Sequence, residues 1–335
     1  LHLALLDRET AAYRPPAHVT VHQLDTRNRL GPSIVQLRRL VRRLRPAATL
    51  SFLTRANVAN AAAMLGSGRP WLISERVNTS AHLAQGRGAV AARAMVRLAY
   101  PRASHVIAVS EGVVEDLTRN FGVPRRRVSS IANPVDHERI TALASERPEI
   151  AVTGDEVVAA GRLVPAKNFA MLLTAFAASG VPGRLVLMGE GPERAALEAQ
   201  AQRLGIADRV LMPGFVANPF AVLSRARLFA MSSNAEGFPN GLVEAMACGL
   251  PVVATNCASG PSEILADAPR EAIAGTHSVE AGALVPPCDA DAFAAALREI
   301  YDSPGRAAMG RAALARSLDY GVERATSEYW RRVEA

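Results

Sequence analysis

Two glutamates separated by seven residues stand around the start of a predicted helix, in the segment SSNAEGFPNGLVEAMACGLPVVAT (232–255). Glu236 lies in the loop before the helix, and Glu244 lies one turn inside it. At this spacing one carboxylate can accept a hydrogen bond from a sugar hydroxyl, while the other accepts hydrogen bonds from both hydroxyls of a ribose. The free backbone N–H groups that open the helix, from Asn240 onward, attract phosphate. The alternative is a pair of solvated glutamates beside a turn.

A second polar turn, GRLVPAKN (161–168), lies between a predicted buried strand and a helix. Gly161 allows a sharp turn, and Arg162 and Lys167 then project near the N-terminus of the next helix. The helix dipole and the two cationic side chains together favour a diphosphate there. Lys167 is the only lysine in the chain, which suggests that a compact ammonium is needed at this position.

Two glycine-containing loops follow further predicted strands, where open α/β sheets place their ligands. The first contains Gly189 and Gly191, and the second contains Gly214 and Val216. Their main-chain groups could line a pocket for a base. Each loop alone is also compatible with an ordinary turn.

Short apolar runs rich in β-branched residues alternate with longer helical patterns, which predicts an α/β protein with parallel sheets. The strands expected in the first half are 1–6, 18–24, 48–53, 70–74, 104–109 and 127–132. Those expected in the second half are 156–160, 184–188, 209–212, 227–231, 251–254 and 282–285.

The alternation is interrupted once, so the 335 residues divide into two Rossmann-like domains. A single core rarely serves a chain of this length. We expect a first domain over 1–138, a linker over 139–153, a second domain over 154–304 and a helical tail over 305–335. Because the chain begins within a predicted strand and without Met, we also expect the first βα unit of the first domain to be missing.

The composition, 49% hydrophobic and 21% charged, is typical of a folded protein. No apolar run reaches the roughly 18–20 residues that span a bilayer, and three cysteines without metal-ligand spacing suit a reducing cytoplasm. Residues 1–150 carry a charge balance of +11, against −4 for residues 151–335. A basic first half indicates an anionic partner, although a general drift toward solvated arginine would give the same count.

Taken together, GRLVPAKN, MGEGPE, PGFVANPF and EGFPNGLVEAMACGLPVVATNCASGPSEIL resemble glycosyltransferase family 4, whose members have the GT-B fold of two Rossmann-like domains facing across a cleft. The ending NCASGPSEIL is similar to the members that build bacterial surface glycans on lipid-linked acceptors. The resemblance implies that Arg162 and Lys167 hold a diphosphate, that Glu244 holds the ribose and that Val216 lies against uracil. It implies that Glu236 contacts the donor sugar and that Glu236, Arg162 and Lys167 are catalytic. The expected donor site is Gly161, Arg162, Lys167, Gly189, Val216, Glu236, Phe238, Asn240, Gly241, Leu242 and Glu244.

By the same resemblance the first half binds the acceptor. Members of the family often have a histidine after an early strand, and the matching stretch here, ISERVNTS (73–80), has Glu75 and Arg76 instead. Arg76 could meet an acceptor phosphate, or the two residues could form a structural salt bridge.

The predicted helix 33–45 lies in the segment SIVQLRRLVRRLRP (33–46). It carries an apolar stripe and, on its other faces, Arg38, Arg39, Arg42 and Arg43. These arginines could hold the protein on the anionic inner face of the cytoplasmic membrane, or they could simply be solvated. Asp289 and Asp291 suggest a metal-binding pair, but aspartates that open a helix usually cap it, so we expect no metal and no cofactor.

The sequence therefore predicts a metal-independent, retaining transferase that moves a hexose or N-acetylhexosamine from a UDP-sugar to a lipid-linked or glycan acceptor. Two alternatives stay open: a GT-B sugar-nucleotide hydrolase or epimerase, and a basic nucleic-acid-binding module. The second alternative is disfavoured because aromatic residues are only 5% of the chain and do not cluster with the arginines.

Overall fold

The computed structural model describes residues 1–8, 15–84 and 88–334. Its contacts divide the chain into two compact units. The first unit is Leu1–Val109, Val113–Ile131 and the end of the chain from Tyr329. The second unit is Ser110–Gly112 and Ala132–Glu328. The polypeptide therefore returns to the first unit after completing the second.

The first unit is built on parallel strands. A four-stranded sheet has the order β3-β4-β5-β6, and β1 pairs with β2 in a separate two-stranded sheet. The strands are β1 (His2–Leu5), β2 (Thr20–Gln23), β3 (Thr49–Phe52), β4 (Trp71–Glu75), β5 (His105–Ala108) and β6 (Val128–Ser130). The helices are α1 (Leu30–Leu44), α2 (Thr54–Met64), α3 (Thr79–His82), α4 (Ala89–Ala99) and α5 (Glu111–Phe121).

The second unit contains a seven-stranded sheet of order β12-β13-β11-β10-β7-β8-β9. All neighbours pair in parallel except β12 and β13, which are antiparallel. The central strands are fully buried and carry side chains such as Val, Leu and Phe, as expected when helices cover both faces. The strands are β7 (Val157–Ala160), β8 (Leu185–Met188), β9 (Val210–Gly214), β10 (Leu228–Met231), β11 (Val252–Thr255), β12 (His277–Val279) and β13 (Gly282–Val285).

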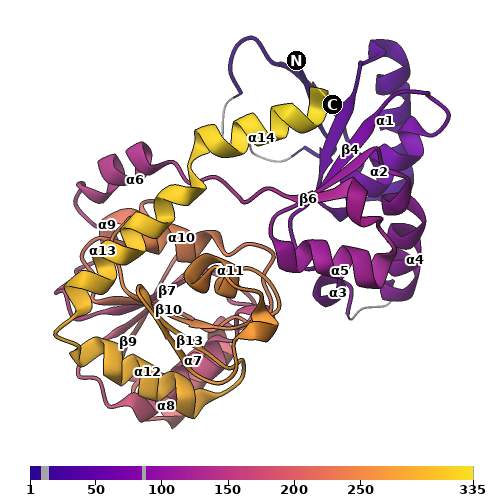
Figure 1. Cartoon of the computed structure of the whole chain (residues 1–335). Coiled ribbons are helices and arrows are strands. Elements are labelled where there is room, and N and C mark those ends of the chain that lie inside the picture. The colour runs from indigo at the N-terminus through magenta and orange to yellow at the C-terminus, as the bar shows by residue number, and fades with distance from the viewer. Residues whose placement is uncertain (9–14, 85–87, 335) are drawn as a thin grey trace. The chain divides into compact units, whose positions relative to one another are not determined.

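Helices cover both faces of this second sheet (Figure 1). On one face α7, α8 and α12 pack together, and their apolar residues, among them Phe176 and Phe293, form one continuous core with the strands. On the other face α9, α10 and α13 pack together. The helices are α6 (His137–Ala144), α7 (Phe169–Ser179), α8 (Arg194–Arg203), α9 (Pro219–Leu223), α10 (Asn240–Ala247), α11 (Pro261–Ala266), α12 (Ala290–Asp302), α13 (Arg306–Ser317) and α14 (Val322–Glu334).

The structure differs from the expected domain boundaries in two places. The second unit begins at Ala132, and the segment 139–153 that we expected to be a linker contains most of helix α6. Asp136 caps that helix by accepting a hydrogen bond from the Arg139 N–H. The expected tail is also divided, because α14 begins in the second unit and its last residues belong to the first. A hydrophobic period can reveal a helix in the sequence, but it does not show to which unit the residues of that helix belong.

Candidate functional site

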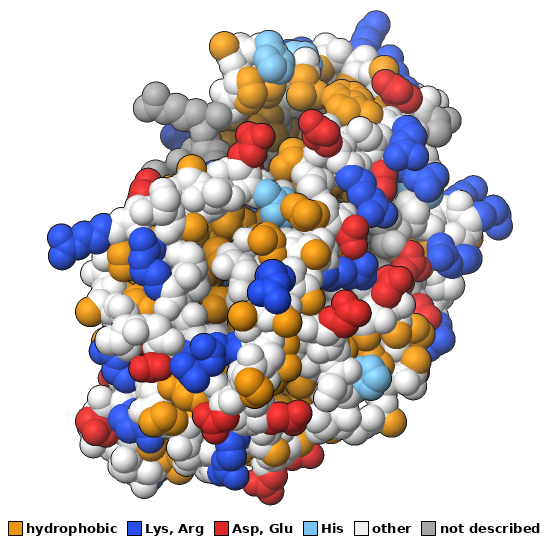
Figure 2. All heavy atoms as spheres, turned by 60° about the vertical axis from the view of Figure 1, so that its left-hand side comes forward, with side chains coloured by type: hydrophobic (Ala, Val, Ile, Leu, Met, Phe, Trp, Pro, Cys, Tyr) orange, Lys and Arg blue, Asp and Glu red, His pale blue; other side chains and the backbone are white. Residues whose placement is uncertain are grey.

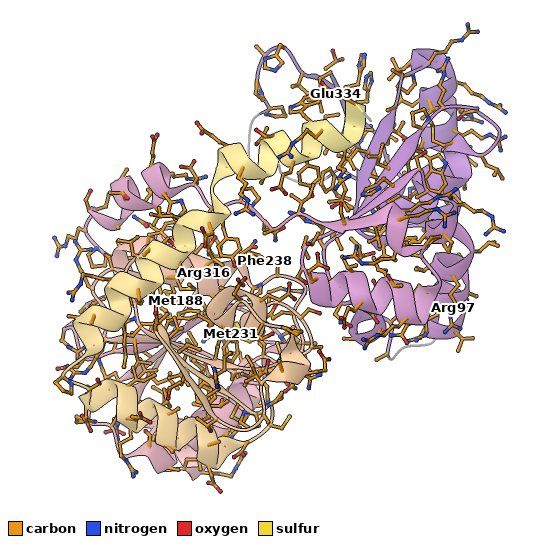
Figure 3. The ribbon with its side chains drawn as sticks, in the orientation of Figure 1. Arg97, Met188, Met231, Phe238, Arg316 and Glu334 are labelled. Carbon is orange, nitrogen blue, oxygen red and sulfur yellow. The ribbon has the colours of Figure 1, made fainter. Side chains whose placement is uncertain are left out.

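The carboxyl ends of four neighbouring strands in the second unit meet at one edge of the sheet. These strands are β11, β10, β7 and β8, and each continues directly into a polar or glycine-containing turn. Met188 and Met231, which end β8 and β10, mark this edge in Figure 3. Ligands of open α/β sheets bind at such an edge. The order of the strands therefore brings the segments after residues 160, 188 and 231 into one neighbourhood.

The turns after β7 and β8 approach each other closely, and each begins with a glycine. Gly161 and Gly189 have φ values of 154° and 145°, and a Cβ on Gly189 would lie 2.0 Å from the Gly161 carbonyl oxygen. The Gly161 N–H donates to the Met188 carbonyl (2.9 Å), and the Gly189 N–H donates to the Gly214 carbonyl (2.8 Å). These contacts fix the path of the backbone that carries Arg162 and Lys167.

Lys167 and Glu236, which we predicted from two separate motifs, form an ion pair. The Lys167 Nζ lies 2.5 Å from Oε1 of Glu236, and the Ser233 hydroxyl donates to the same oxygen at 2.6 Å. The pair is partly enclosed, with 28% of the lysine and 11% of the glutamate side chain exposed. The loops are joined again by the Ser232 hydroxyl, which donates to the Lys167 carbonyl (2.8 Å). The structure thus gives Glu236 a defined orientation, and Ser233 is a site residue that the sequence did not suggest.

Glu244 is in a different electrostatic state. It lies on α10, whose other inward residues are apolar. Burial raises the pKa of its carboxyl above the usual value. Within the part of the chain that the structure describes, no hydrogen-bond donor or cation contacts the carboxylate. A partly buried carboxylate without a partner is costly unless a ligand supplies one, so Glu244 is suited to accept hydrogen bonds from a bound molecule.

The start of α10 offers fewer free N–H groups than the sequence suggested. The Leu242 N–H already donates to the Pro239 carbonyl at 3.0 Å. This correction leaves Asn240 and Gly241 as the first-turn groups available to an anion. Arg162 is exposed, and its side chain makes no hydrogen bond or ion pair among the described residues. No acidic side chain of the described residues therefore compensates the Arg162 guanidinium.

Phe238 faces away from solvent, although we placed it in the donor site. Only 8% of it is exposed, and its ring meets that of Tyr320 edge-on with centroids 5.3 Å apart. The Arg316 guanidinium lies over the other ring, 5.7 Å from the Tyr320 centroid. Figure 3 labels Phe238 and Arg316, which come from the loop before α10 and from α13. The phenyl ring therefore anchors the loop to the helical tail, and only its main chain can face a ligand.

In the loop after β9, two adjacent side chains differ in their exposure to solvent. Val216, which we expected to lie against a base, is 7% exposed, whereas its neighbour Phe215 is 81% exposed.

Glu190, in the loop after β8, accepts two hydrogen bonds from Arg194, at 2.5 and 2.9 Å. The Arg194 guanidinium holds the pKa of Glu190 below its usual value. This pair closes the loop that contains Gly189.

Glu75 and Arg76, the expected acceptor residues, have partners inside the first unit. Glu75 is fully buried and accepts hydrogen bonds from the Tyr100 hydroxyl (2.5 Å) and the Thr54 hydroxyl (3.3 Å), while burial raises its pKa. Its carboxyl is thus part of the interior, which corrects the expectation of an acceptor contact. Arg76 donates to the Tyr329 hydroxyl at 2.8 Å. A salt bridge between the two side chains was the alternative to an acceptor contact. It is absent from the ion pairs of the described residues, where Arg76 donates to the Glu75 carboxylate only through its backbone N–H (3.0 Å).

Asp289 has the capping role that its position suggested. Its carboxylate accepts a hydrogen bond from the Ala292 N–H at 2.9 Å at the start of α12. In the described residues, no group of three or more His, Cys, Asp and Glu side chains is arranged to hold a metal ion.

Comparison with known proteins identifies the two halves. Residues 143–316 match the model of glycosyl transferases group 1, and residues 3–139 match that of glycosyltransferase family 4. A Campylobacter jejuni protein, N-acetylgalactosamine-N,N'-diacetylbacillosaminyl-diphospho-undecaprenol 4-alpha-N-acetylgalactosaminyltransferase, is 32% identical over 235 residues, which are 70% of this chain and 64% of that protein. The lipopolysaccharide core biosynthesis glycosyltransferase LpsE of Rhizobium meliloti is 30% identical over 205 residues, which are 61% of this chain and 56% of that protein. The chain thus spans less than two thirds of the length of these relatives.

Solved structures share the fold at lower identity. HepE of Anabaena in complex with UDP superposes with a TM-score of 0.73 at 23% identity, covering 95% of this chain and 86% of that one. The apo form of WaaB, a lipopolysaccharide outer core galactosyltransferase, gives a TM-score of 0.70 at 19% identity, covering 95% of this chain and 84% of that one. The two matched halves and these neighbours agree: the chain has the GT-B fold and belongs to the glycosyl transferases group 1 family.

Proposed function

We propose that this chain is a retaining glycosyltransferase that moves a hexose or N-acetylhexosamine from a UDP-sugar to a lipid-linked or glycan acceptor during surface polysaccharide assembly. The names of its relatives support the class of reaction. One is an N-acetylgalactosaminyltransferase named for a diphospho-undecaprenol compound, and others are lipopolysaccharide glycosyltransferases. A UDP complex among the structural neighbours supports the nucleotide. The proposal assigns donor binding to the second unit and acceptor binding to the first.

The observation that carries the proposal is the unpartnered carboxylate of Glu244. Its raised pKa results from burial, without an opposing cation or donor among the described residues. A ribose offers two adjacent hydroxyls to such a group and would offset the cost of burying it. Arg162, Lys167 and the start of α10 provide the positive potential for the diphosphate attached to that ribose.

In the proposed mechanism catalysis is electrostatic. Arg162, Lys167 and the helix N-terminus stabilise the charge that develops on the leaving diphosphate. Glu236, oriented by Lys167 and Ser233, stabilises the positive charge that develops on the sugar. The acceptor attacks from the side that the diphosphate leaves, and the leaving phosphate oxygen takes its proton. Because cationic side chains serve the diphosphate, we expect turnover to persist in EDTA.

The test compares Glu236→Gln with Glu244→Gln. UDP-glucose, UDP-galactose and their N-acetylated counterparts are supplied with a lipid-linked glycan pool, and products are identified by mass spectrometry. We expect Glu244→Gln to weaken binding of UDP and UDP-sugar alike. We expect Glu236→Gln to lower kcat by about 10²–10³ with little change in UDP affinity, because it acts on the transition state.

Glu299→Gln is a suitable control, since Glu299 is an exposed residue of α12 whose side chain makes no hydrogen bond or ion pair among the described residues. Equal loss of UDP binding in both test variants would place both carboxylates in the nucleoside pocket and contradict the catalytic role. Release of free sugar without transfer would favour the hydrolase alternative. Inversion of the anomeric configuration in the product would contradict a retaining mechanism.

We further propose that α1 holds the protein on an anionic membrane surface. Four arginines of α1 are exposed, and their side chains make no hydrogen bond or ion pair among the described residues: Arg38, Arg39, Arg42 and Arg43. The inward side of α1 is secured by Leu40 and Val41, which are buried. On the face drawn in Figure 2, by contrast, basic and acidic side chains are interspersed. None of the described helices has the length and apolarity needed to cross a bilayer.

Flotation with vesicles tests this proposal. Replacing the four arginines of α1 by Gln should lower partitioning onto phosphatidylglycerol-containing vesicles by up to about 1000-fold, at about 1 kcal/mol for each arginine. Pure phosphatidylcholine vesicles should bind neither form. The control replaces four exposed arginines outside α1: Arg102, Arg126, Arg203 and Arg311. Equal losses in the two quadruple variants would show that total charge, and not α1, determines the binding.

A further inference from the structure

Asn133 is a buried residue of the second unit whose side chain is only half satisfied. It is 8% exposed. Its Nδ2 donates to Oδ1 of Asn240, the first residue of α10, at 2.7 Å. Its own Oδ1 is buried and has no hydrogen-bond partner among the described residues. The amide thus uses its donor to reach the helix start and leaves its acceptor open.

An open buried acceptor is unusual. Nearly all buried polar groups in folded proteins are hydrogen-bonded, and one that is not costs free energy. Two other described side-chain atoms share this property, the Thr79 hydroxyl and Oδ1 of Asn256. Asn256 differs because its Nδ2 donates to two backbone carbonyls, those of Arg270 and Ile273, which fix it in a structural position. Asn133 alone is linked to a residue of the proposed donor site.

The position of Asn133 limits which hydrogen-bond donor its Oδ1 can bind. Pro134 follows it and favours an extended backbone at Asn133. Its partner Asn240 follows the loop that contains Glu236 and Gly237, where the proposed function places the transferred sugar. An amide oxygen can only accept a hydrogen bond. A sugar hydroxyl is the donor that this ligand would bring to this location.

We propose that Asn133 is a specificity-determining residue whose Oδ1 accepts a hydrogen bond from one hydroxyl of the donor hexose. The inference rests on the proposed function and deepens it by naming a contact to the transferred sugar. Asn240 holds the Asn133 amide in place, so that the oxygen is presented in one orientation. A donor that lacks the matching hydroxyl leaves the oxygen unpaired and is transferred more slowly, as in other sites built around a hydroxyl.

The experiment is a cycle of protein and donor changes. The UDP-hexose that the native chain transfers fastest is compared with its 3-, 4- and 6-deoxy analogues in the native chain and in Asn133→Ala. For one analogue we expect kcat/KM in the native chain to fall by about tenfold or more. Asn133→Ala should show a similar fall with the parent donor and no further fall with that analogue. UDP affinity should change by less than about twofold in this variant, because UDP lacks the hexose.

Thr79→Val is the matched control, because it removes another open buried acceptor in the first unit; it should leave the pattern of the deoxy donors unchanged. Asn133→Asp retains the side-chain volume and an acceptor oxygen but loses the N–H that donates to Asn240. The Asn240 amide can turn its own Nδ2 toward the new carboxylate and hold it in place, so this variant should keep the sensitivity to the deoxy analogue even if Asn133→Ala does not fold. The proposal is overturned if every deoxy donor lowers kcat/KM, relative to the parent donor, as much in Asn133→Ala as in the native chain. It is also overturned if kcat/KM of Asn133→Asp no longer depends on the hydroxyl that the native chain requires. Absence of transfer by the native chain from any UDP-hexose would instead count against the proposed function.

Discussion

At the scale of single residues, the two cationic side chains of the site, Lys167 and Arg162, differ in whether they are already paired. The Lys167 ammonium is bonded to Glu236, so part of its charge is already compensated. Arg162 remains exposed and unpaired among the described residues. A bound diphosphate would therefore compete with Glu236 for Lys167 while meeting Arg162 freely. The sequence identified all three residues but could not indicate that two of them form a pair.

Replacing Lys167 with Ala tests this arrangement. UDP binding should weaken by about 1.5–3 kcal/mol, the range for a hydrogen bond to a charged group, whereas uridine binding should hardly change. Calorimetry measures both. Equal losses for UDP and uridine would show that Lys167 does not contact the diphosphate.

Glu244→Gln should separate stability from binding. Because burial raises the pKa of Glu244 in the folded chain, the unfolded chain holds fewer protons at this group. The native stability therefore decreases as the pH rises from the unfolded pKa through the raised folded pKa. At pH 7 the amide should raise the Tm of the ligand-free protein while weakening UDP binding. A variant with a lower Tm and unchanged UDP affinity would indicate that Glu244 is a structural residue. Thermal melts at pH 5 and pH 7, with and without UDP, provide the measurement.

At the scale of elements, two glycine turns determine where the charged side chains stand. Gly161 and Gly189 allow the ends of β7 and β8 to touch. Asn168, in the left-handed region at φ 49°, then ends the turn and caps α7 by accepting from the Met171 N–H. The turn is therefore specified by backbone conformation at both ends, and Lys167 is held between them.

Gly189→Ala should disturb this turn although residue 189 bears no functional group. The new Cβ would overlap the Gly161 carbonyl, and such overpacking typically costs about 1–3 kcal/mol. We expect a lower Tm and weaker UDP binding. Gly205→Ala provides the control, since Gly205 also has a positive φ but its added Cβ would meet no atom within 4 Å. Equal loss of UDP binding in both variants would rule out the contact with Gly161 as the cause.

Local patterns predicted the elements well because the central strands and amphipathic helices carry their own hydrophobic periods. The strand 227–231, for example, differs from β10 by one residue. The contacts that complete the site were not predictable in this way. Asn133 and Asn240 are 107 residues apart, and Tyr320 reaches Phe238 from the tail. Such pairs depend on tertiary packing, which leaves no periodic signal at either residue. The burial of Glu75 was missed for the same reason, since Tyr100 and Thr54 lie far from it in sequence.

At the scale of the whole molecule, the end of the chain contributes to each unit separately. In the second unit, Tyr320 supports Phe238 with its ring, and its carbonyl accepts from the Val135 N–H at 2.7 Å. Burial raises the pKa of Tyr320 to about 12, so it stays a neutral phenol. In the first unit, Tyr329 contacts Arg76 and Ser74 through its hydroxyl. The tail is thus a structural part of both units.

Tyr320→Ala and Tyr329→Ala distinguish these two roles. Tyr320→Ala removes the ring beneath the loop that carries Glu236, so kcat should fall more than UDP affinity. Tyr329→Ala should leave UDP affinity unchanged, because its partners belong to the first unit. Steady-state kinetics and UDP titration on the two variants provide the comparison. The role assigned to Tyr320 would be wrong if its variant had native kcat.

The single lysine makes the protein unusually easy to probe chemically. Apart from the α-amino group, Lys167 is the only primary amine in the sequence, and 28% of its side chain is accessible. An amine-selective reagent therefore modifies only one side chain, that of Lys167, without any engineered residue. The rate of that modification reports directly on the Lys167–Glu236 pair, and its suppression by UDP would measure occupancy by mass spectrometry. The same amine allows a reporter dye to be attached at one position.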